Sequence, residues 1–293
     1  MRRLKVTCPA LGKAKIAELL ARAGLHLGVS TVGRMLKRDL SRGDIAARLP
    51  GVHTRPVRAS APNDVWHVDL TTVPTAAGFW VPWLPFARLL CWPFAWWVAV
   101  AVDHASRLVV GFAVFARRPT SAQVCSFLRR AIDEAKASPR TIITDQGKEF
   151  GRAFRRWCRL RGIGARRGAI GEHGSIAIVE RFIRSMKAEY TRRILVPFSL
   201  AAMRNELGCY ATWFNEHRPH EVLRGRTPLE VYLDLPPANE APRFEPRDDW
   251  PPKARCAAPN VPIRGQAGAG LALVVTRHEG RTHLPIVALR RTG

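Results

Sequence analysis

Residues 141–150, TIITDQGKEF, form a short apolar run that ends in a carboxylate and a glycine turn. The run predicts a buried strand, because apolar and β-branched residues are followed at once by turn residues. Asp145 then lies at the end of the strand, and Gly147 lets the chain turn away sharply. One acid at a strand end is common, so its meaning depends on which other carboxylates the fold brings beside it.

The segments before this strand predict three more strands and one helix. Residues 64–73, DVWHVDLTTV, alternate between polar and apolar side chains, which is typical of a strand with Asp69 on its polar side. Residues 96–103 and 107–115 are two further apolar strands, joined by the turn sequence DHAS. Residues 120–135 predict a helix that starts with Thr and Ser. The predicted order is three strands, a helix and a strand.

Residues 79–102 are apolar enough to raise the question of a membrane span. Three prolines and Arg88 interrupt this stretch, and Asp103 follows it directly. Prolines break a spanning helix, and unpaired backbone groups are costly in lipid. The stretch therefore predicts a buried hairpin with a Trp-rich connection, and a turn accounts for Asp103.

Two basic helices are predicted after Asp145. Residues 151–167 contain seven arginines. Three large side chains form the packing side of this segment: Phe154, Trp157 and Leu160. Residues 176–193 show the pattern of a strong amphipathic helix. Its apolar face carries Val179, Ile183 and Met186, and another face carries Glu180, Arg184 and Lys187 at helical spacing.

The charge of the chain favours nucleic acid as a partner. The chain has 47 Lys and Arg against 23 Asp and Glu, which gives a net charge of +24. Each phosphate that such a surface neutralises releases condensed counterions, so a polyanion is favoured. An anionic membrane surface, or solubility alone, is the other interpretation.

Residues 13–38 predict a small helix-turn-helix unit. Apolar residues form one stripe on the first helix, which Gly24 ends. Ser30 is a natural N-cap for the second helix, with Val32, Met35 and Leu36 facing inward. The outward face of that helix would carry Ser30, Thr31, Arg34, Lys37 and Arg38. Of these, Ser30, Thr31 and Arg34 would contact base edges of DNA. An ordinary helical hairpin is the other interpretation.

The remaining sequence features concern compartment and termini. Six cysteines are scattered without a CxxC pair, so no zinc site is expected and a reducing cytosol is the simplest compartment. The first residues lack the apolar core of a signal peptide. A further helix is predicted over 199–216, and eight prolines between 235 and 263 predict a linker. Residues 271–291 predict a β-hairpin about Glu279 and Gly280.

Three carboxylates stand out by their position: Asp69 on the first strand, Asp145 after the fourth, and Glu180 on a helix. The first and fourth strands can be neighbours when a helix crosses between them, which would bring both aspartates to one edge. Clustered carboxylates raise each other's pKa unless cations lie between them. Oxygen ligands suit Mg²⁺ or Mn²⁺, and two such ions can promote phosphoryl transfer. Taken singly, each acid is more simply a solvated or salt-bridged residue.

Three blocks resemble the catalytic blocks of the DDE transposase and retroviral-integrase superfamily. They are WHVDLT at 66–71, TDQGKEF at 144–150 and SIAIVERFIRSMKAEY at 175–190, with 34 residues between Asp145 and Glu180. Residues 210–232 are similar to the segment that follows in bacterial insertion-sequence transposases. The resemblance covers about residues 63–232 and extends to the helix-turn-helix. It implies an α/β, ribonuclease-H-like fold, a mixed five-stranded sheet flanked by helices, with Asp69, Asp145 and Glu180 as metal ligands.

These patterns predict five segments along the chain. They are a helix-turn-helix DNA-binding arm at 1–40, a linker at 41–62, an integrase-type catalytic core at 63–234, a Pro-rich linker at 235–263 and a basic β-rich tail at 264–293.

The predicted function is that of a DNA transposase. Hydrolysis at an element's end exposes a 3′-OH, which attacks target DNA, with two Mg²⁺ or Mn²⁺ ions at the three acids. Five basic side chains would hold DNA phosphates: Arg155, Arg156, Arg159, Arg184 and Lys187. The expected partners are double-stranded DNA and further copies of this chain, with no membrane, in the cytoplasm and on the nucleoid.

Two alternatives remain open at the level of sequence. One is a catalytically silent DNA-binding regulator, and the other is a ribonuclease-H-type nuclease without strand transfer. Three nearby acids are expected to bind no metal: Glu149, Glu172 and Glu189.

Overall fold

The computed structural model divides the chain into two compact units. The described residues are 11–37, 59–79, 91–168, 177–236, 258–259 and 270–292. The core unit spans Leu49–Ala211, and the terminal unit joins Met1–Arg48 to Thr212–Gly293. Arg38, Glu172, most of the two predicted linkers and much of the Trp-rich connection lie outside the described residues. The predicted limits of the five segments remain predictions.

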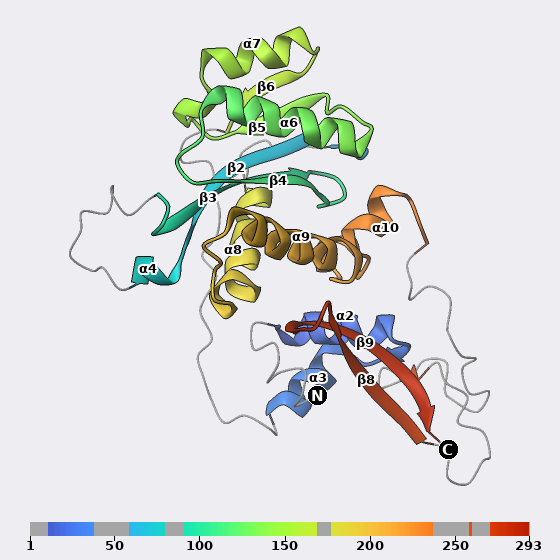
Figure 1. Cartoon of the computed structure of the whole chain (residues 1–293). Coiled ribbons are helices and arrows are strands. Elements are labelled where there is room, and N and C mark those ends of the chain that lie inside the picture. The colour runs from blue at the N-terminus through green and yellow to red at the C-terminus, as the bar shows by residue number, and fades with distance from the viewer. Residues whose placement is uncertain are drawn as a thin grey trace. The chain divides into compact units, whose positions relative to one another are not determined.

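The core unit is built on the mixed five-stranded sheet that the sequence predicts (Figure 1). Its strands are β2 (Val65–Pro74), β3 (Ala95–Asp103), β4 (Val109–Phe115), β5 (Thr141–Thr144) and β6 (Gly164–Arg167), in the spatial order β4-β3-β2-β5-β6. β2, β3 and β4 pair antiparallel, whereas β5 is parallel to β2 and β6 is parallel to β5. The expected neighbourhood of the first and fourth predicted strands is confirmed.

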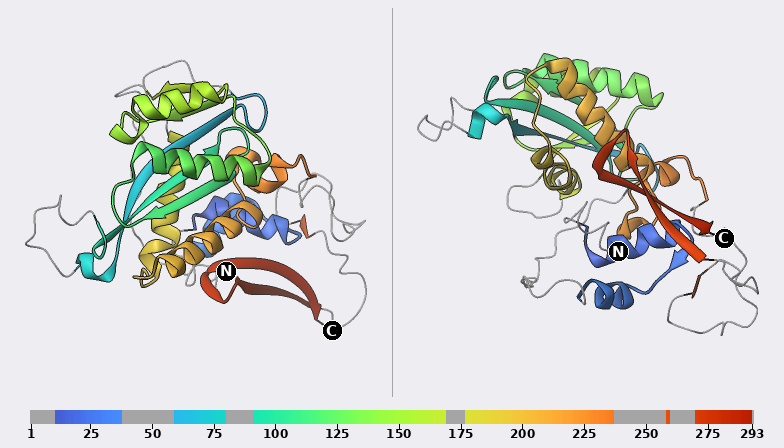
Figure 2. Two further views of the ribbon diagram at one scale, coloured as in Figure 1. Left: turned by 45° about the horizontal axis from the view of Figure 1, so that its top comes forward. Right: turned by 60° about the horizontal axis from the view of Figure 1, so that its bottom comes forward.

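Helices cover both faces of this sheet, as consecutive residues of β4 show. A Cβ on Gly111 would lie 2.9 Å from Cβ of Ala131 in α6 (Ser121–Ala135). Phe112 points to the opposite face, where its ring lies 3.8 Å from the position of a Cβ on Gly208 in α9 (Leu200–Glu216). The helices α6 and α9 therefore flank opposite faces (Figure 1). Two more helices complete the unit: α7 (Arg152–Leu160), which lies beside α6 (Figure 2), and α8 (Ala177–Glu189), which contacts β2 and β3.

Burial on both faces changes the meaning of the polar residues of β2. The sequence suggests a polar side for this strand, but His67 is fully buried and Thr71 nearly so. The Nε2 atom of His67 lies 2.9 Å from Nδ1 of His104, which gives the buried ring a polar partner. Of the polar residues His67, Asp69 and Thr71 on this strand, Asp69 is the one that is half-buried.

The Trp-rich region forms no helix long and apolar enough to cross a membrane within the described residues. The described part of this region begins with α4 (Ala76–Phe79) and ends in β3, which pairs antiparallel with β2. The two strands of the predicted hairpin are therefore present. The indole N–H groups of Trp92 and Trp96 donate to the carbonyls of Phe198 and Pro197, at 3.1 and 2.7 Å. These bonds tie the start of β3 to the segment that follows α8.

The terminal unit has its own small core. Its helices are α2 (Lys13–Arg22), α3 (Val29–Lys37) and α10 (Pro228–Tyr232), and its strands are β1 (Leu25–His26), β7 (Ala258–Pro259), β8 (Gly270–His278) and β9 (Arg281–Thr292). Ile16, Leu19 and Leu20 of α2 are buried with Val32 of α3, and the hairpin residues Leu273, Val275 and Val287 pack against this cluster. The predicted apolar stripe of the first helix is confirmed.

The turns of the terminal unit follow the sequence closely. Gly24 has φ of 96°, which suits the end of α2, and the hairpin turns at Glu279 and Gly280 with φ of 45° and 75°. β1 pairs with β7, so Ala258 and Pro259 of the predicted Pro-rich linker belong to a small sheet. Arg22 of α2 holds Glu230 of α10 through two hydrogen bonds of 2.8 Å, in a largely buried ion pair.

Two details of the predicted helix-turn-helix are wrong. The second helix begins at Val29, so Ser30 lies in its first turn and is no N-cap. Met35 is 43% exposed, whereas Val32 is fully buried and Leu36 is half-buried against the cluster. The reason is the helical period. Val32 and Leu36 are four residues apart and share the buried face of the helix, whereas Met35 lies off that face.

Candidate active site

The two aspartates lie side by side because of the register of β2 and β5. These strands run parallel with Val68 opposite Thr144. The next residue on β2 is Asp69, and the next residue after β5 is Asp145, so both carboxylates occur at the same level of neighbouring strands. Adjacent strands are about 4.8 Å apart. β5 ends at this point, which leaves the aspartates at an open edge.

Glu180 comes to the same region on α8. The apolar face predicted for this helix is confirmed, since Val179, Ile183 and Met186 are buried. Glu180 lies in the first turn and is exposed. Because α8 packs along β2 and β3, its first turn can present this carboxylate toward Asp69.

The acidity of Asp69 shows that the three acids influence one another. The pKa of Asp69 is raised to about 7, first by burial and then by the negative charges of Asp145, Glu180 and Glu149. The hydrogen bond of 2.8 Å that the Leu70 N–H donates to Asp69 Oδ1 opposes this rise in pKa. The structure thus brings the three predicted acids close enough for their charges to influence one another.

The three carboxylates are neighbours, but they do not surround a single point. No trio of carboxylates among the described residues has its oxygen atoms all within 4.8 Å of one another. Asp145 Oδ1 is held by the Gly147 N–H at 3.0 Å, whereas Glu180 is exposed on its helix. A cation shared by all three acids therefore requires a side-chain movement, and Glu180 is the acid best able to make it.

Gly147 is required for space rather than for its backbone angle. Its φ of −55° is open to any residue, so the turn itself does not demand glycine as the sequence suggested. A Cβ at this position would lie 2.4 Å from Glu149 Oε1 and 3.0 Å from Asp145 Oδ1. The absent side chain leaves room for both carboxylates.

Arg118 fixes Glu149 next to this glycine. Its Nε and Nη2 atoms donate to the two oxygens of Glu149, both at 3.1 Å, and the side chain of Glu149 is only 2% exposed. The Glu149 carboxylate therefore has a cation as its partner, and the expectation that it binds no metal stays a prediction. Arg118 could not be found from the sequence, because it lies 31 residues before Glu149 and no local pattern links the two.

Two other acids have structural partners. The buried carboxylate of Asp103 accepts hydrogen bonds from the N–H groups of Asn63 and Ser106, both at 2.8 Å, and from Ser106 Oγ at 2.7 Å. The predicted turn role of Asp103 is confirmed. Glu189 accepts a hydrogen bond of 3.1 Å from the Tyr210 hydroxyl.

The basic residues of α8 differ in their surroundings. Lys187 is half-buried, and its pKa is lowered by burial and by the charge of Arg192, whereas Asp69 acts in the opposite direction. The ammonium of Lys187 therefore lies near the acids. Arg184 is exposed. The predicted DNA contacts of both residues remain predictions.

The arginine-rich segment is a helix and a strand instead of one long helix. α7 ends at Leu160, and Arg166 and Arg167 belong to the edge strand β6. The predicted packing side is wrong at Leu160, which is 77% exposed, whereas Phe154 and Cys158 are buried. Phe154 and Cys158 share a face because they are four residues apart. Arg156 and Arg159 are exposed and Arg155 is half-buried, which leaves a basic outer surface on α7.

The predicted recognition residues lie on α3 of the terminal unit. Ser30 and Arg34 are exposed and Thr31 is half-buried. Arg34 Nη2 lies 3.4 Å from Thr31 Oγ1. The buried side of α3, at Val32, is occupied by the small core, so these polar residues are on the face left for a partner.

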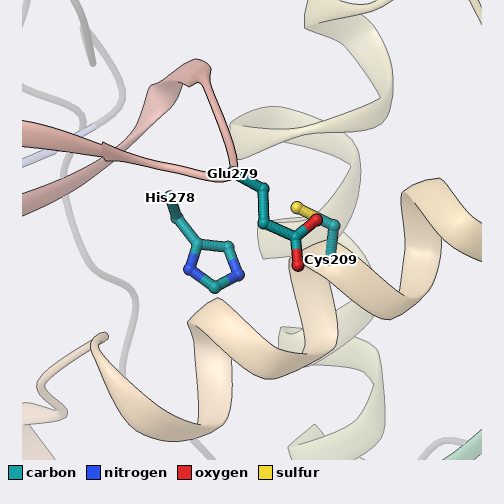
Figure 3. Close-up of side chains that lie close together, drawn as sticks. All are labelled: Cys209, His278 and Glu279. Atoms are coloured by element: carbon teal, nitrogen blue, oxygen red, sulfur yellow. The ribbon is translucent and has the colours of Figure 1, made fainter.

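Figure 3 shows three further side chains of types that bind metals: Cys209 of α9, and His278 and Glu279 at the β8–β9 turn. Cys209 belongs to the core unit, whereas the other two residues belong to the terminal unit. We assign no metal site to them.

Comparison with known proteins supports the assignment of the core. Two family models, each described as Integrase core domain, match residues 59–173 and 161–228. The transposase for insertion sequence element IS904 of Lactococcus lactis subsp. lactis (strain IL1403) is 22% identical over 234 residues, which cover 75% of this chain and 86% of that protein.

Solved structures with low similarity include two viral integrases. The HTLV-2 integrase catalytic core domain in complex with magnesium has a TM-score of 0.43 and 20% identity, and the match covers 60% of this chain and 99% of that one. A simian T-cell lymphotropic virus intasome in complex with a PP2A regulatory subunit has a TM-score of 0.48 and 20% identity, and the match covers 77% of this chain and 71% of that one.

The two matching family models define the class of protein. Residues 59–228 form an integrase core domain, and the protein is a polynucleotidyl transferase. Together with the IS904 relative, this core shows that the chain belongs to the insertion-sequence transposases with an integrase core.

Proposed function

We propose that Asp69, Asp145 and Glu180 hold two divalent ions, Mg²⁺ or Mn²⁺, and that this site cleaves DNA at the ends of an insertion sequence and joins them to target DNA. The observation that carries the proposal is the parallel register of β2 and β5, which sets Asp69 beside Asp145. The raised pKa of Asp69 supports it, because cations would compensate the charge that now favours a proton.

The chemistry that such ions supply is the activation of a water or 3′-OH nucleophile and the stabilisation of charge on the leaving oxygen. The residues of this chain orient the carboxylates and hold the DNA phosphates. Gly147 N–H positions the Asp145 carboxylate, and Arg118 keeps Glu149 away from the role of a ligand. Lys187, half-buried near Asp69, is placed to hold a phosphate next to the reacting one.

The test of the proposed function is the nature of the products. Purified protein is incubated with a labelled element end, a target plasmid and Mg²⁺ or Mn²⁺. Joined DNA supports the transposase, cut but unjoined strands would instead indicate a nuclease without strand transfer, and DNA binding without any product would indicate a silent regulator. The transposase relative and the integrase core do not favour either alternative.

The raised pKa of Asp69 predicts how the stability of the metal-free protein depends on pH. The pKa of Asp69 is about 7 in the folded protein, against an ordinary value of 3.8 that applies to the unfolded chain. The folded state therefore binds this proton more tightly than the unfolded state does. Stability is then fully present below about pH 4 and falls as the pH rises through 7, by up to about 4 kcal/mol. Urea unfolding in EDTA between pH 4.5 and 8 measures this effect.

The control for that measurement is Asp69→Asn, which removes the titrating group. We expect its free energy of unfolding to change much less over the same pH range. In the native protein at about pH 8, added Mg²⁺ should restore stability, because a ligand that binds only the folded state stabilises it. An equal pH dependence in both proteins would rule out Asp69 as the cause.

We further propose that two surfaces bind DNA in different ways. On α3, Ser30, Thr31 and Arg34 would read bases, since exposed residues early in a recognition helix reach base edges. On α7, Arg155, Arg156 and Arg159 would contact phosphates, and Arg184 of α8 would add to this hold. We also propose that the protein works in the cytoplasm, on the nucleoid, as a homo-oligomer that brings element ends and target together.

One titration at several salt concentrations distinguishes these two surfaces. Replacing Arg155, Arg156 and Arg159 by Gln should flatten the slope of log K against log salt, by up to about 0.9 for each phosphate that the variant no longer neutralises. Arg34→Ala should instead reduce the preference for element ends over random DNA by about 1–3 kcal/mol. The matched control replaces exposed Arg130, Arg140 and Arg204 by Gln. An equal slope change in the control would mean that only net charge matters.

A further inference from the structure

A cavity opens in the core unit between the end of β2 and the end of α8. Its volume is about 640 Å³, in the range of small-molecule sites. The end of β2 and α4 form one side, through Val73, Pro74 and Ala76, and the end of α8 and the following turn η2 (Thr191–Arg193) form the other. Lys187 lines the cavity and lies near enough to Asp69 for the charge of that carboxylate to oppose the lowering of the Lys187 pKa.

The position of the cavity follows from the direction of β2. Asp69 and Val73 are four residues apart on this strand and point to the same face. At about 3.3 Å per residue, the cavity wall at Val73 lies about 13 Å along the strand from Asp69. A DNA strand held with one phosphate at the acids would therefore pass the cavity after a short distance.

The lining combines two cations with an apolar wall. Lys187 and Arg192 both line the cavity, and neither forms an ion pair within the described part of the chain. Their charges are close enough for Arg192 to lower the pKa of Lys187. Two cations at one cavity favour an anion there, and a phosphate can accept hydrogen bonds from both.

The apolar wall is suited to a flat ring. It includes Val73, Pro74, Ile194 and Leu195, and Leu195 is 87% exposed. An exposed leucine beside two cations offers contact area to a ligand that is apolar on its face and anionic at its edge. A nucleotide has this character, since its base has an apolar face and its phosphate is charged.

We propose that this cavity takes one unpaired nucleotide of the DNA strand that is cut, with its base against the apolar wall and its phosphate between Lys187 and Arg192. The nucleotide has to be unpaired, because a paired base is enclosed in the duplex stack and cannot enter a cavity. The inference rests on the proposed function, which places the cut strand at the acids. It adds that the protein holds the end of the DNA in an opened form.

The test is a binding measurement that needs no catalysis. A duplex with a single-nucleotide overhang and a blunt duplex of the same sequence are titrated with the full-length protein in EDTA, by fluorescence anisotropy. We expect the overhang duplex to bind about tenfold more tightly, as stacking of one base provides. Ala76→Phe, which fills the cavity, should abolish this preference and leave binding of the blunt duplex unchanged.

A second variant keeps the test decisive if Ala76→Phe fails to fold. Leu195→Glu places a negative charge at the exposed wall and should remove the preference without affecting the core. Leu233→Glu is its matched control, as an exposed leucine that does not line the cavity. Arg192→Gln should weaken binding of the overhang duplex several-fold, and Arg193→Gln, its neighbour outside the cavity, should not.

The inference is overturned if the native protein binds both duplexes equally, or if the preference survives in Ala76→Phe and Leu195→Glu. These outcomes are separable from failure of the proposed function. If the native protein shows no overhang preference but its strand transfer still requires the three carboxylates, only the nucleotide-binding role of the cavity is contradicted. If the overhang preference is present but strand transfer does not require the three carboxylates, the active-site assignment is contradicted and the role of the cavity stands.

Discussion

Glu180→Gln is expected to abolish both end cleavage and strand transfer, by about 10³-fold or more, because the amide keeps the shape of the side chain but loses the charge that binds a cation. Asp69→Asn and Asp145→Asn should have the same effect, since the register of β2 and β5 sets both aspartates at one edge. DNA binding in EDTA should survive in all three variants. The measurement is the yield of joined DNA with Mg²⁺ or Mn²⁺.

The controls for these variants come from acids with other roles. Glu134→Gln is the matched control for Glu180, because Glu134 is also exposed on a helix of the core unit. Glu149 is unsuitable as a control, since its amide would break the ion pair with Arg118. Retained joining in any one of the three acid variants would contradict the assignment of the active site. Loss of joining in Glu134→Gln would show that removing any one carboxylate charge from the core unit lowers the yield of joined DNA, whatever its position.

Gly147→Ala is expected to reduce strand transfer by about 10- to 100-fold without unfolding the protein. The added Cβ would lie 2.4 Å from Glu149 Oε1, and the Arg118 pair leaves that carboxylate little room to move. The chain at Gly147 would then shift and carry the Asp145 carboxylate with it, and a displacement of about 1 Å is enough for losses of this size. Strand transfer and thermal unfolding, measured together, separate misplacement from instability.

The matched control is Gly208→Ala on α9, where a Cβ meets only the Phe112 ring at an ordinary 3.8 Å. Alanine in a helix is favoured over glycine, so this variant should be stabilised by about 0.5–1 kcal/mol and remain active. Shortening Glu149 to Asp in the Gly147→Ala background should recover part of the activity by making room. Full activity of Gly147→Ala alone would contradict the role given to this glycine.

The individual strands and helices were predictable because their signals are local. Alternation in DVWHVDLTTV and the apolar run TIIT predict strands, and the spacing of Val179, Ile183 and Met186 predicts the amphipathic helix α8. Similarity of the blocks around Asp69, Asp145 and Glu180 to a known superfamily added the catalytic interpretation. The hairpin turn at Glu279 and Gly280 was also predictable, because it separates two apolar runs and Gly280 readily adopts its positive φ of 75°.

Predictions that depended on exact helix limits were less accurate. Met35 and Leu160 were expected to face inward because they are large and apolar, but both are exposed. Each of these two residues lies off the buried face of its helix. Which face is buried depends on the elements that pack against the helix, and not on the size or polarity of one side chain. Ser30 was expected to cap α3, which instead begins at Val29 and includes Ser30 in its first turn.

The sequence by itself predicted most of the strands and helices and the net positive charge, because periodicity and residue type encode them over short distances. The mixed sheet and the joint role of the three acids were implied only by the resemblance of three sequence blocks to a known superfamily. Only the tertiary structure decided that Arg118 neutralises Glu149, that Gly147 is needed for space beside Asp145, and that Lys187 and Arg192 line one cavity. The physical reason is that these relations arise from the approach of separate strands, helices and turns. Their distances depend on how the chain packs, and no local pattern of residues records them.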